Sequence, residues 1–475
     1  MKRENMGVDR ITTLPESIIH HIMSHMSTKE VVRTSVLSKR WFHMRKNYPV
    51  LEFPLTKKTK DLVYKSLHHF RQEKLLLQTF CVYMTDLSLS SDLDSLIRLA
   101  LENQVKELRL TLNSRAISLW LYTLPQPIFS SKTLTTLKLS SCFLDQPLSA
   151  FSSLRKLYLE GCRVDGQIIL KHGDCPLLED LGLLNCEGFG CVYVSDLSQL
   201  HSLEVSFDGA DGTNEFVISC QSLQSFTIRS HAFKPWSVVN MDGCNHLKSL
   251  HLQSKTITDS EFHSLLSKLP LLEELYLFHC DELKSINISS PRIKTLEICP
   301  EPECYSQLEF IGIDAPNLRN FIFLAKDKDC EIKIEDCQNL ETLVLFWRLI
   351  TDTLFHDLVS QFPLLVNLWV IGCQELQRIE IPNLQLKRLH IVRCFRLKAV
   401  KVDGPNLFEF CCTGREAVEF SVVTSASGLR FECDHEDSLS THWSCRLDDI
   451  LYYFVRVEDE SLIDIILNSA YEFPE

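Results

Sequence analysis

The sequence predicts an α/β fold in which a small helical head precedes a long solenoid of stacked repeats. Three observations predict it. The stretch Thr258–Ile298 recurs ninety-three residues later as Thr351–Ile391, with a cysteine at the same offset, Cys280 and Cys373. A shorter leucine motif recurs from about residue 105 onward, and two helix-start signals stand near the N-terminus. Self-similarity at a fixed period is the sequence signature of a repeat architecture.

The shorter motif is Leu-x-x-Leu-x-Leu-x-x-Cys, in which other aliphatic or aromatic residues can replace leucine. Its clearest copies begin at Leu134, Leu154, Leu178, Leu272, Leu365 and Leu386. Weaker copies begin at Val105, Leu200, Leu223, Leu247, Ile293, Leu318, Leu340, Leu407 and Leu429. Their mean spacing of roughly 23 residues lies inside the range of about 20–29 that is typical of leucine-rich repeats.

The alternation within the motif predicts a strand with one buried face, because successive side chains of a strand point to opposite sides. One repeat cannot bury this face alone, so we expect the repeats to stack into a curved parallel sheet. Two long return segments have helical spacing, and Thr258 and Thr351 are expected to start their helices. Shorter returns after Cys280 and Cys394 alternate with period two, which predicts extended structure on the convex side.

The first forty residues predict the helical head. Thr13 and Ser27 each stand three residues before a glutamate, which is the capping-box signature of a helix start. An apolar stripe with helical spacing follows over residues 18–26, and a third short helix is expected from Ser38 through Trp41. Three helices of this size cannot bury all their apolar side chains unaided. They therefore either cap the solenoid or present a docking face to another protein.

Charge is divided unevenly along the chain. Residues 1–60 hold twelve Lys and Arg against five Asp and Glu, a net charge of +7, so the remainder carries −20 to reach the total of −13. The division into a basic head and an acidic body indicates that the two parts attract partners of different charge. The acidic body argues against a nucleic-acid partner, which would need a basic stripe.

The sequence predicts neither secretion nor membrane insertion. Its first residues, Met-Lys-Arg-Glu-Asn, contain no apolar core, and no apolar run approaches the roughly 18 residues of a membrane span. Nineteen cysteines in a chain without a secretory signal are expected to be reduced thiols. These observations predict a location in the nucleus and/or cytoplasm.

The head carries a characteristic set of residues between Asp9 and Phe53. It reads Asp9-Arg10-Ile11, Leu14-Pro15, Thr28-Lys29, Val32, Thr34-Ser35, Leu37-Ser38-Lys39-Arg40-Trp41 and Leu51-Glu52-Phe53. This segment resembles the plant-type F-box, and with the repeats behind it the chain resembles the plant F-box/leucine-rich-repeat family. The head departs from that pattern at His25-Met26-Ser27, where the family usually has Phe-Leu-Pro, and at Arg45, where a tryptophan is common.

The resemblance implies a role in ubiquitination. In that family the F-box docks on the Skp-type adaptor of an SCF (Skp–cullin–F-box) ubiquitin ligase, and the repeats hold the substrate. Carried over by position, the residues that would face the adaptor are Leu14, Pro15, Ile18, Ile22, Val32, Leu37, Ser38 and Trp41. The family's adaptor is acidic, which suits the basic head and would speed association. His25 and Ser27 weaken the apolar face, so a lower adaptor affinity is expected.

The expected fold class is thus α/β, with an N-terminal three-helix F-box followed by a leucine-rich-repeat solenoid. The expected domains are the F-box at 1–53, a linker and N-terminal solenoid cap at 54–104, the solenoid at 105–435, and a C-terminal cap or acidic tail at 436–475. Within the second segment, residues 61–104 predict a helix, a strand and a helix.

No cofactor, metal site or catalytic group is predicted. The cysteines recur about one repeat apart, whereas zinc sites use closely spaced pairs. Buried thiols at the strand ends explain this ladder better. The seventeen histidines are scattered, and no nucleophile elbow or phosphate-binding loop is present in the sequence. A hydrolase that uses a Cys/His pair is therefore the least favoured class.

The concave face of a solenoid is its usual binding surface. Early repeats place polar residues at its solvent-facing positions: Thr136, Lys138, Ser140, Lys156, Glu160, Ser202 and Glu204. Later repeats place apolar residues there: Tyr276, Phe278, Ile322, Leu324, Val344, Phe346, Trp369, Ile371 and Val392. Apolar patches of this kind usually mark binding sites, so these nine residues are the expected substrate surface. Alternatively, the C-terminal tail, with Leu451, Phe454, Leu462 and Ile466, folds back and covers them.

The sequence therefore predicts a protein that is not itself an enzyme but is the substrate-recognition subunit of an SCF-type ubiquitin ligase. Its expected partners are a Skp-type adaptor, through it a cullin, and a protein target; no nucleic acid and no membrane is expected. The rival interpretation is a repeat scaffold whose helical head only caps the solenoid and has no part in ubiquitination.

Overall fold

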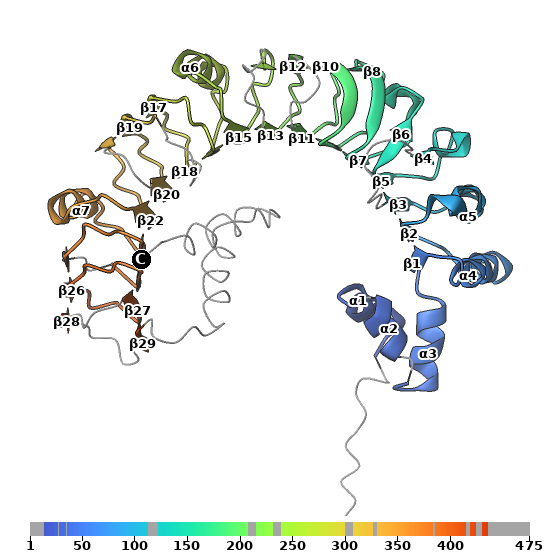
Figure 1. Ribbon diagram of the computed structural model, residues 1–475, viewed down its shortest axis with the longest axis horizontal. Helices are drawn as coiled ribbons and strands as arrows, with labels where there is room; N and C mark the ends of the chain where they lie inside the picture. The colour runs from blue at the N-terminus through green and yellow to red at the C-terminus, as the bar shows by residue number, and fades with distance from the viewer. Residues whose placement is uncertain are drawn as a thin grey trace, which may run out of the picture. The chain divides into compact units, whose positions relative to one another are not determined.

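The computed structural model describes residues 14–26, 28–34, 36–112, 122–207, 215–230, 239–299, 307–325, 330–382, 385–414, 419–423 and 430–435. The chain divides into two compact units. Unit 1 comprises residues 1–207 and 214–222, and unit 2 comprises residues 208–213 and 223–475. Each unit is built on one long parallel sheet with helices and further strands on one side of it (Figure 1).

Unit 1 begins with three short helices, which we call the head: α1 (Glu16–Ser24), α2 (Thr28–Thr34) and α3 (Lys39–Lys46). Helix α1 begins after Pro15, whose carbonyl accepts bonds from the amides of Ile18 and Ile19, both at 3.1 Å. The Ser38 hydroxyl caps α3 by accepting the Trp41 amide at 3.2 Å, so the third helix begins where the sequence predicts. The expected capping residues Thr13 and Ser27 lie outside the described residues.

The long sheet of unit 1 has seven strands: β1 (Val50–Leu55), β2 (Thr79–Met84), β3 (Glu107–Leu112), β5 (Thr136–Ser140), β7 (Lys156–Glu160), β9 (Asp180–Leu184) and β11 (Ser202–Phe207). Each pairs in parallel with the next. The register sets one leucine of each repeat beside the next, as in Leu137, Leu157 and Leu181, which are at most 1% exposed. Burial of each such side chain contributes roughly 1.5–3 kcal/mol, which holds neighbouring repeats together.

The leucine core of unit 1 is closed on its other side by helices and a second sheet (Figure 1). Helices α4 (Lys60–Gln72) and α5 (Ser90–Glu102) come first. A parallel sheet then follows: β4 (Tyr122–Thr123), β6 (Cys142–Leu144), β8 (Arg163–Leu170), β10 (Glu187–Ser195) and β12 (Glu215–Ser219). Three short 3-10 turns complete this side: η1 (Leu87–Leu89), η2 (Gln126–Ile128) and η3 (Leu148–Ala150).

Unit 2 repeats this plan. Its long sheet has ten strands: β13 (Ser225–Ser230), β15 (Ser249–Ser254), β16 (Glu274–Phe278), β18 (Thr295–Cys299), β20 (Asn320–Ala325), β22 (Thr342–Trp347), β23 (Asn367–Ile371), β25 (Arg388–Val392), β27 (Glu409–Gly414) and β29 (Arg430–His435). They pair in parallel in this order. In each unit we call the side of the long sheet that faces away from the leucine core the front face.

Behind the core of unit 2 lie helices α6 (Asp259–Ser267) and α7 (Asp352–Val359) and short strands. The strands form two parallel sheets, β17 (Ser285–Ser289), β19 (Phe310–Asp314) and β21 (Glu331–Glu335), and then β24 (Arg378–Ile381), β26 (Ala399–Asp403) and β28 (Glu419–Val423). Strand β14 (Val239–Asn240) belongs to the same unit. Thr258 forms a capping box with Glu261, and Thr351 caps α7, so the predicted mixture of helical and extended returns is confirmed.

Each of the fifteen predicted motif copies begins just before a strand of one of the long sheets. The predicted start of the solenoid at residue 105 is wrong, however, because β1 and β2 already pair in parallel and continue into β3. The expected helix, strand and helix of residues 61–104 are α4, β2 and α5, but they are repeats rather than a cap. Leu51-Glu52-Phe53 was too short a run to show its strand character by periodicity.

The cysteine ladder is built of buried thiols, as predicted. The sixteen cysteines whose side chains the structure describes are all buried, and none of them forms a disulfide. Several donate to a carbonyl of the preceding repeat, as Cys162 does to Leu139 at 3.5 Å and Cys394 to Val370 at 3.7 Å. These thiols therefore join consecutive repeats at the ends of their strands.

Candidate docking surfaces

The head has its own core, made of four side chains that are at most 5% exposed: Ile19, Met23, Val31 and Trp41. Partly buried side chains close its edge: Leu14, Ile22, Met26, Met44 and Tyr48. The Arg40 guanidinium donates to the Leu14 carbonyl at 2.6 Å and so ties the segment before α1 to α3. The head thus folds around residues of all three helices.

The eight residues predicted to face an adaptor fall into two groups. The exposed group consists of Pro15, Ile18, Val32 and Leu37. Leu14 and Ile22 are half-buried against the head core, and Ser38 is half-buried with its hydroxyl engaged in the cap of α3. Trp41 is 1% exposed, which corrects the prediction that it faces an adaptor: its indole fills the core of the head.

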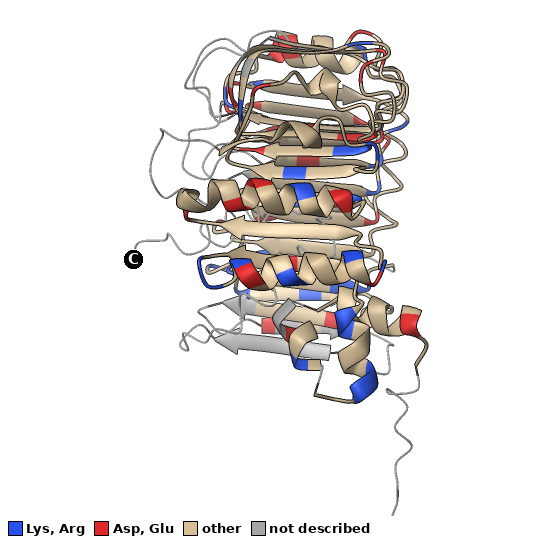
Figure 2. Ribbon diagram, turned by 90° about the vertical axis from the view of Figure 1, so that its right-hand side faces the viewer, with Lys and Arg blue, Asp and Glu red and all other residues tan. Residues whose placement is uncertain are grey.

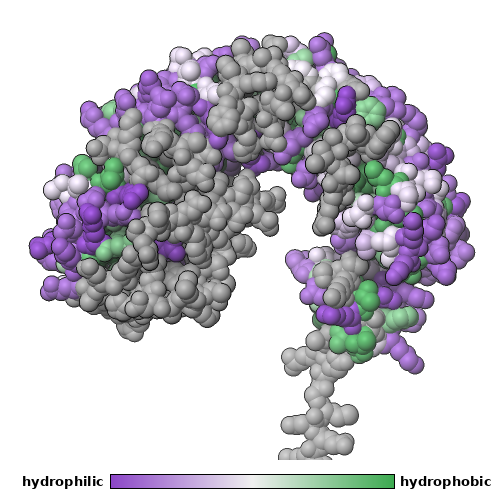
Figure 3. Space-filling view, viewed as in Figure 1, coloured by the Kyte–Doolittle hydropathy of each residue, from purple (hydrophilic) through white to green (hydrophobic). Residues whose placement is uncertain are grey.

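Two exposed apolar side chains of the head escaped the sequence analysis. Val36 is 86% exposed and Phe42 is 39% exposed. The charged ends of Arg45 and Lys46 lie 5.4 and 5.5 Å from the centroid of the Phe42 ring, within cation–π range. Val36 and Phe42 are not part of the motif that carries the resemblance. The only sequence signal for them was that they adjoin the motif residues Leu37 and Trp41. Hydrophobic surface over the head is visible in Figure 3.

The basic character of the head is concentrated at the end of α3. His43, Arg45 and Lys46 occupy its last turn, where cations interact favourably with the helix dipole. Lys and Arg are visible on the head in Figure 2. On α4 and α5, by contrast, cations are paired with acids, as Arg71 is with Glu102 at 2.7 Å. The head therefore combines exposed apolar side chains with positive charge.

The front face of unit 1 is polar and open. None of its seven predicted polar positions is fully buried: Lys138, Lys156 and Glu160 are exposed, and Thr136, Ser140, Ser202 and Glu204 are half-buried. Arg109 continues the same row and is ion-paired with Glu107 at 2.6 Å. The predicted polar character of this face of unit 1 is confirmed.

One aromatic residue, Tyr158, interrupts this polar surface; we call its ring the platform of unit 1. The Tyr158 ring packs closely against Gly182 of the next strand: a Cβ on that glycine would stand 2.5 Å from Tyr158 Cδ1. The Lys138 ammonium lies 4.9 Å from the ring centroid on the other side. Tyr158 is nevertheless only half-buried. The absence of a side chain at Gly182 therefore leaves the space that the Tyr158 ring occupies.

The front face of unit 2 begins with an aromatic stack. The His251 and Tyr276 rings lie parallel, with centroids 4.0 Å apart, on the adjacent strands β15 and β16. Phe278 lies beside Tyr276, and both are half-buried. Two of the nine predicted substrate-binding residues thus lie together at this end of the face.

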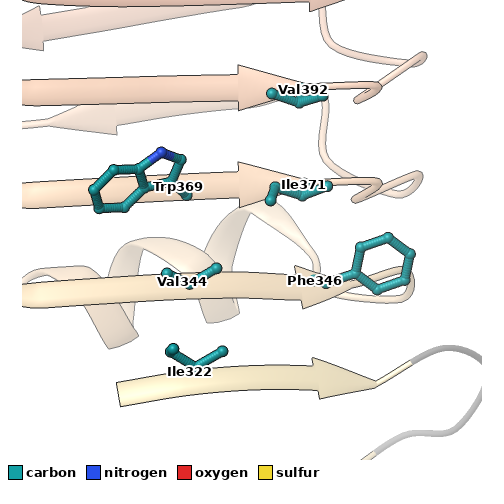
Figure 4. Packing of buried hydrophobic residues seen from close by; sticks show 6 residues of the cluster. All are labelled: Ile322, Val344, Phe346, Trp369, Ile371 and Val392. Carbon is teal, nitrogen blue, oxygen red and sulfur yellow. The ribbon is translucent and has the colours of Figure 1, made fainter. Parts of the chain in front are cut away.

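Six more of the nine form one cluster over β20, β22, β23 and β25: Ile322, Val344, Phe346, Trp369, Ile371 and Val392 (Figure 4). Leu324 is partly buried and packs against them. We call these seven residues the front cluster. The sequence therefore placed them correctly on one face, and the in-register pairing of the strands brings them together.

The predicted exposure of these side chains is wrong. The six clustered residues are only 3–7% exposed, and every residue of β22 is buried, so this strand is covered on both sides. Period-two alternation tells which side of a sheet a residue faces, but not what lies over that side. The alternative prediction, that the C-terminal tail covers these positions, falls on residues outside the described ones.

A buried carboxyl adjoins the front cluster, and the sequence analysis missed it. Glu297 lies between Tyr276 and Ile322 in the strand register and is 1% exposed. Its Oε1 accepts from the Cys299 thiol at 3.3 Å, and its Oε2 has no hydrogen-bond partner among the described residues. Burial raises the pKa of Glu297 to about 7. A glutamate at a front position between an aromatic and an aliphatic residue was the available signal.

Two further features bear on what these surfaces can do. Among the described residues, no group of three or more His, Cys, Asp and Glu side chains is placed to hold a metal ion. No described helix is long and apolar enough to cross a membrane.

The chain matches two families of known domains. Residues 11–44 match the F-box domain. Residues 68–208, 216–337 and 329–459 match the leucine-rich-repeat domain described as At1g61320/AtMIF1. The two matches together cover the head and most of the repeats.

Similar whole proteins come from Arabidopsis thaliana. The chain is 32% identical over 212 residues to F-box protein At5g03100. The aligned stretch covers 44% of this chain and 66% of that protein. It is 29% identical to F-box/LRR-repeat protein At5g02910, over 42% of this chain and 43% of that protein. It is 32% identical to F-box/LRR-repeat protein 25, over 42% of this chain and 76% of that protein. The chain thus spans less than two thirds of the first two of these relatives.

Proposed function

Because the chain belongs to the plant family of F-box proteins with leucine-rich repeats, we propose that it is the substrate-recognition subunit of an SCF-type ubiquitin ligase. In this proposal the head docks on a Skp-type adaptor, and through it on a cullin. The repeats hold a protein target, and the chain itself carries out no chemical step. It would act in the nucleus or the cytoplasm.

The exposed apolar side chains of the head are the observation that carries this proposal. Ile18, Val32 and Leu37 are 44%, 46% and 57% exposed, on a module whose own core is already filled. Large apolar side chains left in water on so small a module favour a docking partner. The exposed positive charge beside them suits an acidic partner and would speed encounter.

The packing of the head also argues against the rival role as a cap. The closest packing of α1 and α2 is with α3 rather than with the long sheet. A cap would lay its apolar side chains over the edge of the first strand. Here the apolar side chains that remain outside the head core are exposed instead.

The proposed mechanism is tethering. A target held on the front face and a head held by the adaptor keep a target lysine near the ubiquitin-conjugating enzyme. Linking two binding events in this way converts a bimolecular encounter into an intramolecular one, with an effective concentration that is on the order of millimolar for short flexible connections. The chain contributes position rather than chemistry.

The front faces of the two units are the surfaces proposed for the target. Unit 1 offers exposed polar groups such as Lys138 and Glu160. Unit 2 offers the half-exposed Tyr276, Phe278 and Leu324 at the margin of the front cluster. Aromatic residues with a polar rim are common anchors in protein interfaces.

The test of the proposal is capture of a purified Skp-type adaptor by the full chain. Val32→Asp with Leu37→Asp should reduce capture at least tenfold, because two exposed apolar contacts are replaced by charge that an acidic adaptor repels. Leu76→Asp is the matched control, since Leu76 is 70% exposed but lies outside the head, and it should capture normally. Circular dichroism should show all three proteins equally folded. Failure of the unmodified chain to capture the adaptor would favour the rival scaffold role.

A further inference from the structure

The front cluster is buried on a side of the sheet where the leucine core does not lie. Trp369 is 3% exposed and Val344 is 7% exposed, although both point away from the core residues Leu368 and Leu343 that flank them. A strand of a sheet with one open face should have one buried and one exposed side. Strand β22 has two buried sides.

Packing between neighbouring strands does not explain this burial. Tyr158 occupies the same central row of the front face in unit 1 and packs against Lys138 and Gly182, yet it is only half-buried. Tyr276 stacks closely on His251 in unit 2 and is also only half-buried. Neighbouring side chains on the front face cover one another's sides but leave the surface that points away from the sheet exposed. Something else must lie over the front cluster.

The described apolar residues do not supply this cover, because the cluster consists of side chains from β20, β22, β23 and β25, with Leu324 also on β20. The ring of His390 on β25 stacks on Trp369, with centroids 5.5 Å apart, but it stands beside Trp369 in the same row of front positions. The undescribed connections of unit 2 before β29 are short: the longest, residues 231–238, has eight residues, and those after β18 and β20, at residues 300–306 and 326–329, have seven and four. Each has to lead into the next described element, and none is long enough to cross four strands and return.

The chain beyond β29 is long enough. It comprises the forty residues 436–475, and β29 is joined to β20 through β27, β25, β23 and β22. Five strand spacings of about 4.8 Å amount to roughly 24 Å. An extended chain advances about 3.3 Å per residue, so the eleven residues before Leu447 suffice to reach any strand of the cluster.

The sequence of this segment suits an apolar surface. The i, i+3, i+4, i+7 spacing of an amphipathic helix is found at Leu447, Ile450, Leu451 and Phe454. Further along the segment, Leu462 and Ile466 are again four residues apart. The segment also holds ten Asp and Glu against two Arg. If this segment forms a helix, its apolar stripe needs an apolar surface to pack against, while the acidic side chains can remain in water.

We propose that residues 447–466 of the same chain dock on the front cluster through this apolar stripe. The part of unit 2 best suited to hold an apolar target is then occupied by the protein itself. Under the proposed function, a target of apolar character has to compete with this segment, while a polar target can use the open front face of unit 1.

The test compares full-length proteins by hydroxyl-radical footprinting of individual side chains, in the absence of adaptor and target. Leu451→Asp with Phe454→Asp places two charges on the stripe and should increase the labelling of Trp369 several-fold. Tyr452→Asp is the matched control, because helical spacing puts residue 452 on the opposite side, and it should leave Trp369 protected. Trp347, which is 4% exposed behind the same sheet, should stay protected in all proteins and reports that unit 2 remains folded.

A photo-crosslinker in place of Phe346 identifies what lies over the cluster. Crosslinks to residues 447–466 of the same chain would support the proposal, even if the charged variant disturbed folding. Crosslinks to residues 300–306 or 326–329 in place of them would overturn it, as would crosslinks between chains in a mixture of isotopically labelled and unlabelled protein. Crosslinks to Ile322 and Leu324 are expected in either case, because both belong to the cluster that contains position 346. Unchanged protection of Trp369 in the double variant would overturn it as well. None of these outcomes depends on whether the head binds an adaptor.

Discussion

The front faces of unit 1 and unit 2 are built on the same repeat and have opposite character. In both units the leucines of the motif stack in register and are almost completely buried. The residues between the leucines are free to differ, and they do: Lys138 is exposed in unit 1, whereas Trp369 is buried in unit 2. The comparison teaches that the motif specifies the stacking, and the intervening positions specify what each face can bind.

The largest expected effect contrasts one aromatic from each face. Trp369→Ala should destabilise the protein by about 3–5 kcal/mol, because it leaves a cavity in a covered cluster. Tyr158→Ala should cost only about 1 kcal/mol, since its side chain is only half-buried. Urea unfolding of the full-length variants measures both. Equal losses would mean that the two faces are equally covered.

The next effect depends on pH and concerns the buried carboxyl of unit 2. The pKa of Glu297 is raised from 4.5 to about 7, so folding favours its protonated form. The stability that this group contributes is complete below about pH 4.5 and is lost as the pH rises through about 7. Glu297→Gln should remove that dependence and gain about 3 kcal/mol relative to wild type between pH 4 and pH 8. Parallel stability curves for the two proteins would contradict the assignment.

The smallest effect concerns the platform of unit 1. Gly182→Ala should cost about 1–3 kcal/mol, because the new methyl group meets the Tyr158 ring at 2.5 Å and the ring must shift. Tyr158→Ala in the same chain should abolish this extra cost, since it removes the group that clashes. A double-mutant cycle by urea unfolding gives the coupling between the two positions. If the costs simply add, the tyrosine does not lie over the glycine in solution.

Much of the fold could be predicted because repetition amplifies a weak local signal. A single Leu-x-Leu alternation is ambiguous, but fifteen copies at similar spacing fixed the positions of fifteen strands. Thr258 and Thr351 likewise marked the starts of α6 and α7 through their capping chemistry. The strands β1 and β2 were missed as repeats, since they stand before the regular leucines and interleave with helices α4 and α5.

The docking surfaces were less accessible to prediction. Position in a motif suggested that Trp41 faces outward, but a large ring on a small three-helix module is needed inside it. Alternation placed the front cluster on the correct face of the sheet, yet burial on that face depends on contacts remote in sequence. Glu297 carried only a weak signal, its front position between an aromatic and an aliphatic residue, because a lone glutamate in a strand usually lies in water. Exposure and burial are therefore the properties that required coordinates.

The duplicated stretch of unit 2 records how such a protein can acquire a new specificity. Counting ninety-three residues along the chain takes Tyr276 to Trp369, Glu297 to His390 and Cys280 to Cys373. The thiol is common to both copies, whereas the phenol and the carboxyl of the first copy stand where the second has an indole and an imidazole. A crossover between the two copies would delete or add four repeats without disturbing the spacing of those that remain. The gene of such a protein can thus change the length and the side chains of the front face in a single recombination event.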